Sequence, residues 1–234
     1  MRKKITVRGE SIVLDCSTRS LELCSQMNYE VENLDFIDSL PKNSCYLDIG
    51  ACEGRFSIYA KKRGLNVYSF EPEKRNFEIL LQNHLLNSMD TSNCFNLGLA
   101  EFETESIMRI GQPWAGGHQK VIDNDNERVD LTFDTLETQV VQIIDLDTCL
   151  NKFKIPTPKA IKIDIDGSEV PFMKGALKTL SNADVNKILF ELQTEDMAYQ
   201  WIIDQIISCG FSLIQTFNIP NEPNLKNHLF EKLK

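Results

Sequence analysis

The sequence lacks several features that would assign it to common classes of protein. Its seven cysteines are odd in number, are scattered, and form no C-x-x-C pair, which disfavours a zinc site or a disulfide framework. No uninterrupted run of about 18 apolar residues occurs, so no membrane span is expected. The basic N-terminus MRKKITVRGES is not followed by an apolar segment, so no signal peptide is predicted. Together these absences predict a cytoplasmic protein.

Positive charge is also scarce. The chain has 25 Lys and Arg residues against 34 Asp and Glu residues, which gives a net charge of -9. Nonspecific binding of nucleic acid requires a cationic face, so no nucleic-acid partner is predicted.

The pattern of apolar residues divides the chain into two parts. Residues 1–40 predict a partly helical extension, with one helix that starts at residue 21 and ends before Pro41. This extension could cover an active site or mediate formation of a homodimer. Residues 41–234 predict one domain in which strands and helices alternate. The polar segment 101–138 interrupts this alternation and predicts a hairpin or a mobile insertion.

The alternation predicts an α/β fold with a doubly wound sheet, because strands joined by helices run parallel. The last two strands, over 211–219 and 227–233, are joined by a turn and predict an antiparallel C-terminal hairpin. The other predicted strands cover residues 45–50, 65–72, 92–100, 139–144, 159–165 and 186–192. The predicted helices between them cover residues 54–64, 73–87, 145–153, 169–180 and 195–210.

The stretch CYLDIGACEGRFS predicts a ligand site, because such sheets bind ligands beyond the carboxyl ends of their strands. Gly50 and Gly54 suit a tight turn between a strand and a helix that start close together. Glu71 ends the next strand, 23 residues after Asp48, where a carboxylate can accept the protons of a ribose diol. The alternative is a plain turn followed by an exposed glutamate. We favour a nucleoside.

Glycine is missing where a pyrophosphate would need it. Counted from Gly50, the later positions of G-x-G-x-x-G hold Cys52 and Arg55, which disfavours a dinucleotide. S-adenosyl-L-methionine has a ribose, a sulfonium and an amino group but no phosphate, so acidic residues such as Asp48 and Glu71 suit it.

Five stretches resemble the FkbM-like family of S-adenosylmethionine-dependent methyltransferases. They are YLDIGACEGRFSIYA, VYSFEPEKRNFEILLQNHLLN, IIDLDTCL, IKIDIDGSEVPFMKGA and ILFEL. The resemblance implies a class I methyltransferase (Rossmann-like) fold with a seven-stranded sheet in the order 3-2-1-4-5-7-6. It also implies methyl transfer to a hydroxyl of a sugar, lipid or secondary metabolite. The chain departs from the family at Cys52, where Asn is usual, and at Asp166, where Glu is usual.

We therefore predict a cofactor site for S-adenosyl-L-methionine. Its predicted residues are Asp48, Gly50, Ala51, Cys52, Gly54, Phe56, Glu71, Pro72 and Asp164.

The stretch IKIDIDGSE carries the predicted reacting centre. Asp164 and Asp166 end a strand and lie two residues apart, so their side chains are expected to point to the same side. Asp164 is predicted to face the transferred methyl group or the amino group of the cofactor. The two acids could also hold a divalent cation. No calcium-loop spacing follows them, and no metal ligands are predicted.

The sequence offers only three histidines as a general base, and His118 is the predicted one. It lies in the loop PWAGGHQK, where an imidazole could take a proton from an alcohol or bind the acceptor. Trp114 and the glycines after it suggest a lid over the site.

Two alternative functions remain at this point. Asp145 and Asp147 form a D-x-D motif, which could hold a metal on a sugar nucleotide in a glycosyltransferase. A helix cap explains the same residues more simply. The departures at Cys52 and Asp166 are also compatible with a cofactor-binding module that has lost catalysis.

Overall fold

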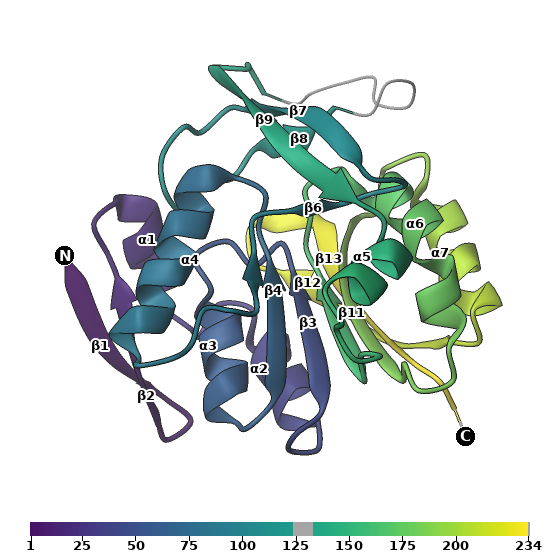
Figure 1. Ribbon diagram of the computed structural model, residues 1–234, viewed down its shortest axis with the longest axis horizontal. Helices are drawn as coiled ribbons and strands as arrows, with labels where there is room; N and C mark the ends of the chain where they lie inside the picture. The colour runs from purple at the N-terminus through teal and green to yellow at the C-terminus, as the bar shows by residue number, and fades with distance from the viewer. Residues whose placement is uncertain (124–132, 234) are drawn as a thin grey trace.

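The main sheet of the protein has seven strands, as seen in a computed structural model that describes residues 1–123 and 133–233 (Figure 1). The strand order is β12-β13-β11-β10-β3-β4-β5. Counting these strands along the chain gives 3-2-1-4-5-7-6, so the predicted order and fold class are confirmed. The bounds are β3 Cys45–Ile49, β4 Asn66–Phe70, β5 Cys94–Phe95, β10 Ala160–Ile163, β11 Lys187–Gln193, β12 Ser212–Ile219 and β13 Glu222–Glu231.

The five strands β11, β10, β3, β4 and β5 are parallel, and β13 runs antiparallel to both of its neighbours. All five residues of β3 are buried, as expected for a central strand that is covered on both faces. The predicted C-terminal hairpin is present. Its turn has Asn221 with φ 68°, a left-handed conformation that asparagine tolerates well.

Helices cover both faces of the main sheet (Figure 1). One core cluster joins the sheet to the later helices through Leu47, Ile49, Phe172 and Ile206. The other cluster joins the opposite face to earlier helices through residues such as Tyr46 and Phe36. Helices α2 (Val31–Asp38), α3 (Arg55–Lys62) and α4 (Lys74–Leu86) come before β5, and α5 (Leu146–Lys152), α6 (Glu169–Ser181) and α7 (Tyr199–Ser208) follow β9.

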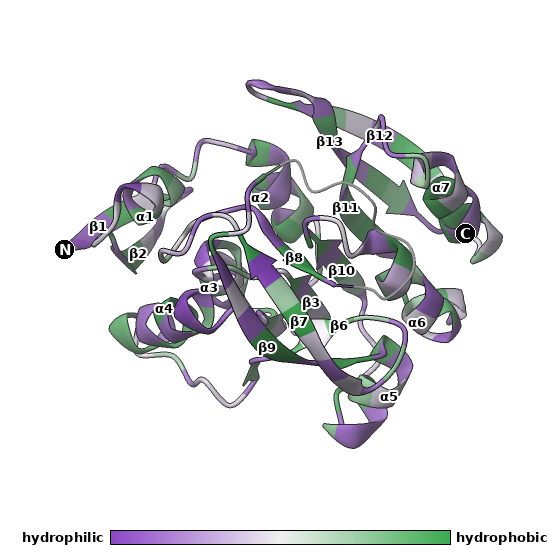
Figure 2. Ribbon diagram, turned by 90° about the horizontal axis from the view of Figure 1, so that it is seen from above, coloured by the Kyte–Doolittle hydropathy of each residue, from purple (hydrophilic) through white to green (hydrophobic). Residues whose placement is uncertain are grey.

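A second sheet of four strands lies across the carboxyl ends of β3 and β4 (Figures 1 and 2). Its strands, in the order β6-β9-β7-β8, are β6 Gly98–Leu99, β9 Glu137–Ile144, β7 Thr104–Ile110 and β8 Lys120–Ile122. Strands β7 and β8 form the hairpin that was predicted within 101–138. Most of the polar segment 123–130, which was part of the predicted mobile insertion, lies outside the described residues.

The predicted strand over 92–100 is divided between the two sheets. Cys94 and Phe95 pair with β4, whereas Gly98 and Leu99 pair with β9. A Cβ at Gly98 would lie 2.6 Å from Ile122 Cδ1 and 3.0 Å from Ile143 Cγ2, so any larger residue would push these two side chains of the second sheet aside. This crossing places residues 97–99 against the ligand cavity.

The N-terminal residues begin with a hairpin of β1 (Arg2–Val7) and β2 (Glu10–Asp15), which the sequence interpretation missed. Asn83 and Asn87 of α4 hold it: Asn83 Oδ1 accepts the Asp15 amide at 2.7 Å, and Asn87 bonds both backbone groups of Val13. The single helix predicted between residue 21 and Pro41 is two helices, α1 (Arg19–Cys24) and α2.

Within residues 1–123 and 133–233, no helix has both the length and the apolar character that crossing a membrane requires.

Candidate functional site

A cavity of about 870 Å³, including the open space at its mouth, lies at the carboxyl ends of β3, β4 and β10. The structure brings most of the predicted site residues to its wall, but Asp48 and Gly54 do not line it. The predicted residues that do are Gly50, Ala51, Cys52, Phe56, Glu71, Pro72, His118 and Asp164.

The loop after β3 has its amide groups already occupied. The amides of Gly50 and Ala51 both donate to the carbonyl of Phe70 at 3.0 Å, and the Cys52 amide donates to Glu71 Oε2 at 2.9 Å. Phosphate-binding loops instead present free amides to the ligand. The loop is therefore built against the edge of β4 and does not offer a cradle for a pyrophosphate.

Gly50 is required at its position for a steric reason. Its φ is +76°, and a Cβ there would lie 1.6 Å from the carbonyl oxygen of Asp164. The loop after β3 thus passes directly against the end of β10. Gly54 instead caps α3 with φ +83° and packs on Leu80 of α4, away from the cavity.

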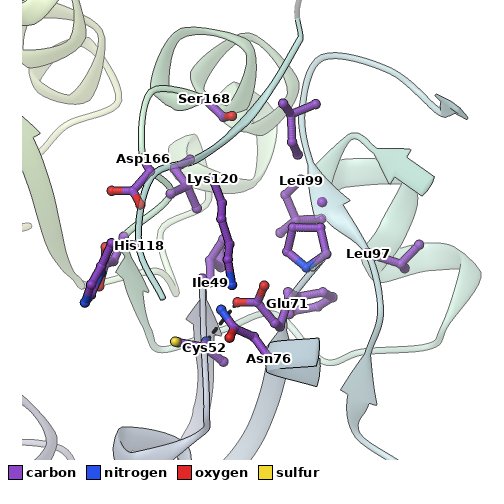
Figure 3. Close-up of a pocket in the computed structure, with 18 of the residues that line it drawn as sticks. Ile49, Cys52, Glu71, Asn76, Leu97, Leu99, His118, Lys120, Asp166 and Ser168 are labelled. Carbon is purple, nitrogen blue, oxygen red and sulfur yellow. Dashed lines mark hydrogen bonds between the residues drawn. The ribbon is translucent and has the colours of Figure 1, made fainter. Parts of the chain in front are cut away.

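Glu71 is fixed at the tip of β4 and is only 6% exposed, so the alternative of an exposed glutamate does not hold. Its Oε2 accepts the Cys52 amide at 2.9 Å (Figure 3). Its Oε1 accepts the Glu73 amide, also at 2.9 Å. Burial raises the pKa of this carboxyl to about 7. Each oxygen retains a lone pair that can accept a further hydrogen bond from a ligand in the cavity.

Asp48 lies beneath the cavity in a buried polar row. The period of two in β3 turns it toward α3, where it accepts a hydrogen bond from Ser57, and its strand neighbours are Ser69 and Lys162. Lys162 Nζ is 3.8 Å from Asp48 Oδ1 and 3.0 Å from Asp164 Oδ2. Burial raises the pKa of Asp48.

Asp164 follows β10 and reaches the cavity wall. Although burial opposes its ionisation, the Lys162 ammonium and its hydrogen bond hold the pKa of Asp164 below its ordinary value. Asp164 is therefore a stable anion that faces the cavity. An anion at this place suits a cationic group of a ligand.

A second buried cation, Arg55, lies at the polar end of the cavity. Its guanidinium pairs with Glu53 at 3.1 Å and with Glu30 at 3.2 Å, and it lies 4.6 Å from the centre of the Phe56 ring. Glu30 reaches it because the helical structure is interrupted between α1 and α2, where Glu30 has the left-handed φ of 59°. The N-terminal residues thus help to hold the side chain of Arg55, which lines the site.

The loop between β7 and β8 forms one rim of the cavity and carries His118. Asn76 Oδ1 accepts the Gly116 amide at 2.8 Å, and Thr18 donates to the Ala115 carbonyl at 2.8 Å. Trp114 is 43% exposed, and its Nε1 donates to Ser20. This rim is therefore tied to α4 and to the N-terminal residues. The exposed His118 side chain lies at the mouth, on the same side as Asp166 (Figure 3).

The opposite side of the cavity is lined by the apolar residues Leu97 and Leu99. Figure 3 shows Leu99 on the side away from Asp166 and His118. Phe70, Met108 and Ile122 extend this wall. An apolar wall beside the buried Glu71 carboxylate and the ionised Asp164 fits a nucleoside that carries a cationic chain. The wall suits the base, Glu71 suits the ribose hydroxyls, and Asp164 suits the cation.

The D-x-D pair serves the structure of α5 and α6. Asp145 caps α5 by accepting the Thr148 amide at 2.8 Å, as the helix-cap interpretation predicted. Asp147 accepts the Thr179 amide at 2.8 Å. Neither residue lines the cavity, and the glycosyltransferase alternative is not favoured.

Several polar residues at the cavity were not predicted. Lys120 lies on the wall and pairs with the buried Glu73 at 3.0 Å, and Lys162 and Arg55 are the cations described above. Lysine within the apolar stretches of β8 and β10 was the only signal in the sequence, because a lysine in a buried strand needs an anionic partner. The identity of that partner depends on the three-dimensional arrangement.

Comparisons with known proteins agree with this fold. A protein of Streptococcus mutans, described as an S-adenosylmethionine-dependent methyltransferase, has a TM-score of 0.52 at 14% identity, covering 98% of this chain and 55% of that one. SMU.776, described as a methyltransferase and solved with S-adenosylhomocysteine, has a TM-score of 0.50 at 13% identity, covering 98% and 56%. At these identities the likeness defines the fold, which is that of class I methyltransferases.

The family is defined by the sequence itself. The model of the methyltransferase FkbM domain matches residues 48–213, and the chain therefore belongs to the FkbM methyltransferase family. No curated protein matches it. Family and fold support S-adenosyl-L-methionine as the cofactor.

Proposed function

We propose that this protein transfers the methyl group of S-adenosyl-L-methionine to a hydroxyl oxygen of a sugar, lipid or secondary metabolite. The observation that carries the proposal is the loop of residues 50–52. Its amides already donate to the Phe70 carbonyl of β4 and to Glu71. The site therefore offers a nucleoside carboxylate oxygens as acceptors and has no free amides in this loop to bind a phosphate. S-adenosyl-L-methionine, when bound, supplies a methyl group that is already activated by the sulfonium.

The residues of the chain position the two reactants. Glu71 accepts the ribose hydroxyls, while the apolar wall of Leu97 and Leu99 holds the adenine. Asp164 attracts the positive charge of the methionine part. Holding the acceptor oxygen in line with the methyl group supplies much of the rate, because alignment replaces a bimolecular encounter.

An alcohol must also lose its proton, and His118 is the proposed base. It lies at the mouth, where an acceptor has to enter, and it is exposed enough to pass the proton to water. Asp164 is less suited to this task, since its lowered pKa makes its carboxylate a weak base.

The test is incubation of the purified protein with S-adenosyl-L-methionine carrying a labelled methyl group, together with fractionated cell extract. A labelled product of low molecular mass, carrying an O-methyl group, is expected. His118→Gln should lower turnover by about 10²–10⁴-fold while the affinity for S-adenosylhomocysteine stays unchanged. Cofactor binding without transfer to any fraction would contradict the enzymatic role, and transfer to nitrogen or to a macromolecule would contradict the acceptor class.

A further inference from the structure

Three carboxylates meet at the ends of two neighbouring strands. Ile163 pairs with Phe190 in the parallel register of β10 and β11, so Asp164 and Glu191 are the next residues on the two strands. Asp166 lies two residues after Asp164, in the turn that precedes α6. One carboxylate oxygen from each of these three acids lies within 4.8 Å of the others.

Glu191 is the unexpected member of this group, because the sequence analysis placed it only within the predicted strand over 186–192. It is only 9% exposed, and its carboxylate has no hydrogen bond or ion pair with any residue in 1–123 or 133–233. Burying a carboxylate without a partner is costly. Its side chain points into the group formed with Asp164 and Asp166.

The two nearest buried cations form their ion pairs with other carboxylates and not with Glu191. Lys162 is shared between Asp48 and Asp164, and Arg55 is held by Glu30 and Glu53. Lys162 bonds only Oδ2 of Asp164, which leaves the other oxygen for a further ligand. Among residues 1–123 and 133–233, no cation therefore forms an ion pair with Glu191 itself.

The spacing of the oxygens fits a small ion. Hard divalent cations bind carboxylate oxygens at roughly 2.0–2.6 Å, so two oxygens on one ion lie at most about 4–5 Å apart. We propose that Asp164, Asp166 and Glu191 bind a divalent cation such as Mg²⁺ or Mn²⁺ through their carboxylate oxygens. Water molecules complete the coordination, because three carboxylates supply only part of the ligands that these ions take.

The position of this ion has a consequence for the reaction, and this consequence rests on the proposed function. Asp164 and Asp166 line the polar end of the cavity, next to the mouth with His118. An acceptor hydroxyl bound to the ion there would be more acidic, and His118 would remove its proton more readily. The acceptor class would then be a compound with oxygen atoms that can chelate a metal, such as a diol.

The test is a titration of the full chain with Mn²⁺, after removal of metals with a chelator, followed by electron paramagnetic resonance of the free ion. One bound Mn²⁺ per chain is expected, and Mg²⁺ should displace it. Glu191→Gln should weaken binding at least about tenfold. Asp166→Asn should do the same and should preserve the fold, since Asp166 is exposed and asparagine tolerates its φ of 34°.

Glu195→Gln is the matched control, because Glu195 is exposed and lies just beyond the same strand. It should leave the affinity unchanged. Absence of Mn²⁺ binding, or equal affinity in Glu191→Gln, Asp166→Asn and the unmodified protein, would overturn the proposal. The titration contains neither cofactor nor acceptor, so its outcome is independent of whether the protein transfers methyl groups.

Discussion

Replacement of Glu71 by alanine tests the cofactor site at its most buried acid. Glu71→Ala removes a carboxylate that is 6% exposed and that accepts the amides of Cys52 and Glu73. If this carboxylate also accepts the ribose hydroxyls, the variant loses at least one hydrogen bond to a charged group, about 1.5–3 kcal/mol. The dissociation constant of S-adenosylhomocysteine should therefore rise roughly 10- to 150-fold.

Isothermal titration calorimetry with S-adenosylhomocysteine measures this change. Glu78→Ala removes an exposed carboxyl from the same region and should bind as the unmodified protein does. The two amides released in Glu71→Ala destabilise the loop, so a thermal melt must accompany the titration. An S-adenosylhomocysteine analogue without ribose hydroxyls separates the two effects: the substitution should weaken its binding much less. Unchanged affinity for the natural compound would refute the ribose role of Glu71.

Two further predictions concern the same loop. Burial raises the pKa of Glu71 to about 7, and hydroxyl donors bind its ionised form better. The affinity for S-adenosylhomocysteine should therefore rise roughly tenfold from pH 6 to pH 8. Glu71→Gln should abolish this pH dependence. A flat profile in the unmodified protein would contradict this. Gly50→Ala should destabilise the protein by about 4 kcal/mol or more in denaturant unfolding, because its Cβ would overlap the Asp164 carbonyl at 1.6 Å. Gly9→Ala is the control, because a Cβ at Gly9 meets no atom within 4 Å. Its left-handed backbone alone should lower the free energy of unfolding by about 1–2 kcal/mol. Equal losses of stability in the two variants would show that the contact of Gly50 with Asp164 is unimportant.

Much of the main sheet was predictable because the sequence encodes it locally. Alternating strands and helices set the parallel core, and the strand order came from the resemblance to the family. The glycine turn and Glu71 were recognisable by their spacing, since two adjacent parallel strands bring their carboxyl ends together. The pair of aspartates does lie close together, but β10 ends at Ile163 and Asp166 stands in a turn with φ 34°, so the turn and not the period of a strand brings them together.

The parts that were missed depend on contacts between distant residues. The hairpin β1–β2 is held by asparagines of α4, about 70 residues further along the chain. The sequence of the hairpin itself does not indicate these partners. The break between α1 and α2 brings Glu30 to Arg55. Asp48 points away from the cavity because Ser57 and Lys162 bind it on the α3 side.

Glu191 shows the same limit most clearly. In the stretch ILFEL it has the neighbours of a core residue, and its burial agrees with that interpretation. Only the register of β10 against β11 brings it opposite Asp164. A buried acid in a central strand was the one available signal, and its meaning depended on what lay across the sheet.

The central claim is that the carboxyl ends of β3, β4 and β10 hold S-adenosyl-L-methionine. A crystal structure of the protein with S-adenosylhomocysteine tests this directly. We predict the ribose hydroxyls on Glu71, the adenine against Leu97 and Leu99, and the amino group near Asp164. A ligand bound elsewhere, or a ribose turned away from Glu71, would contradict the account.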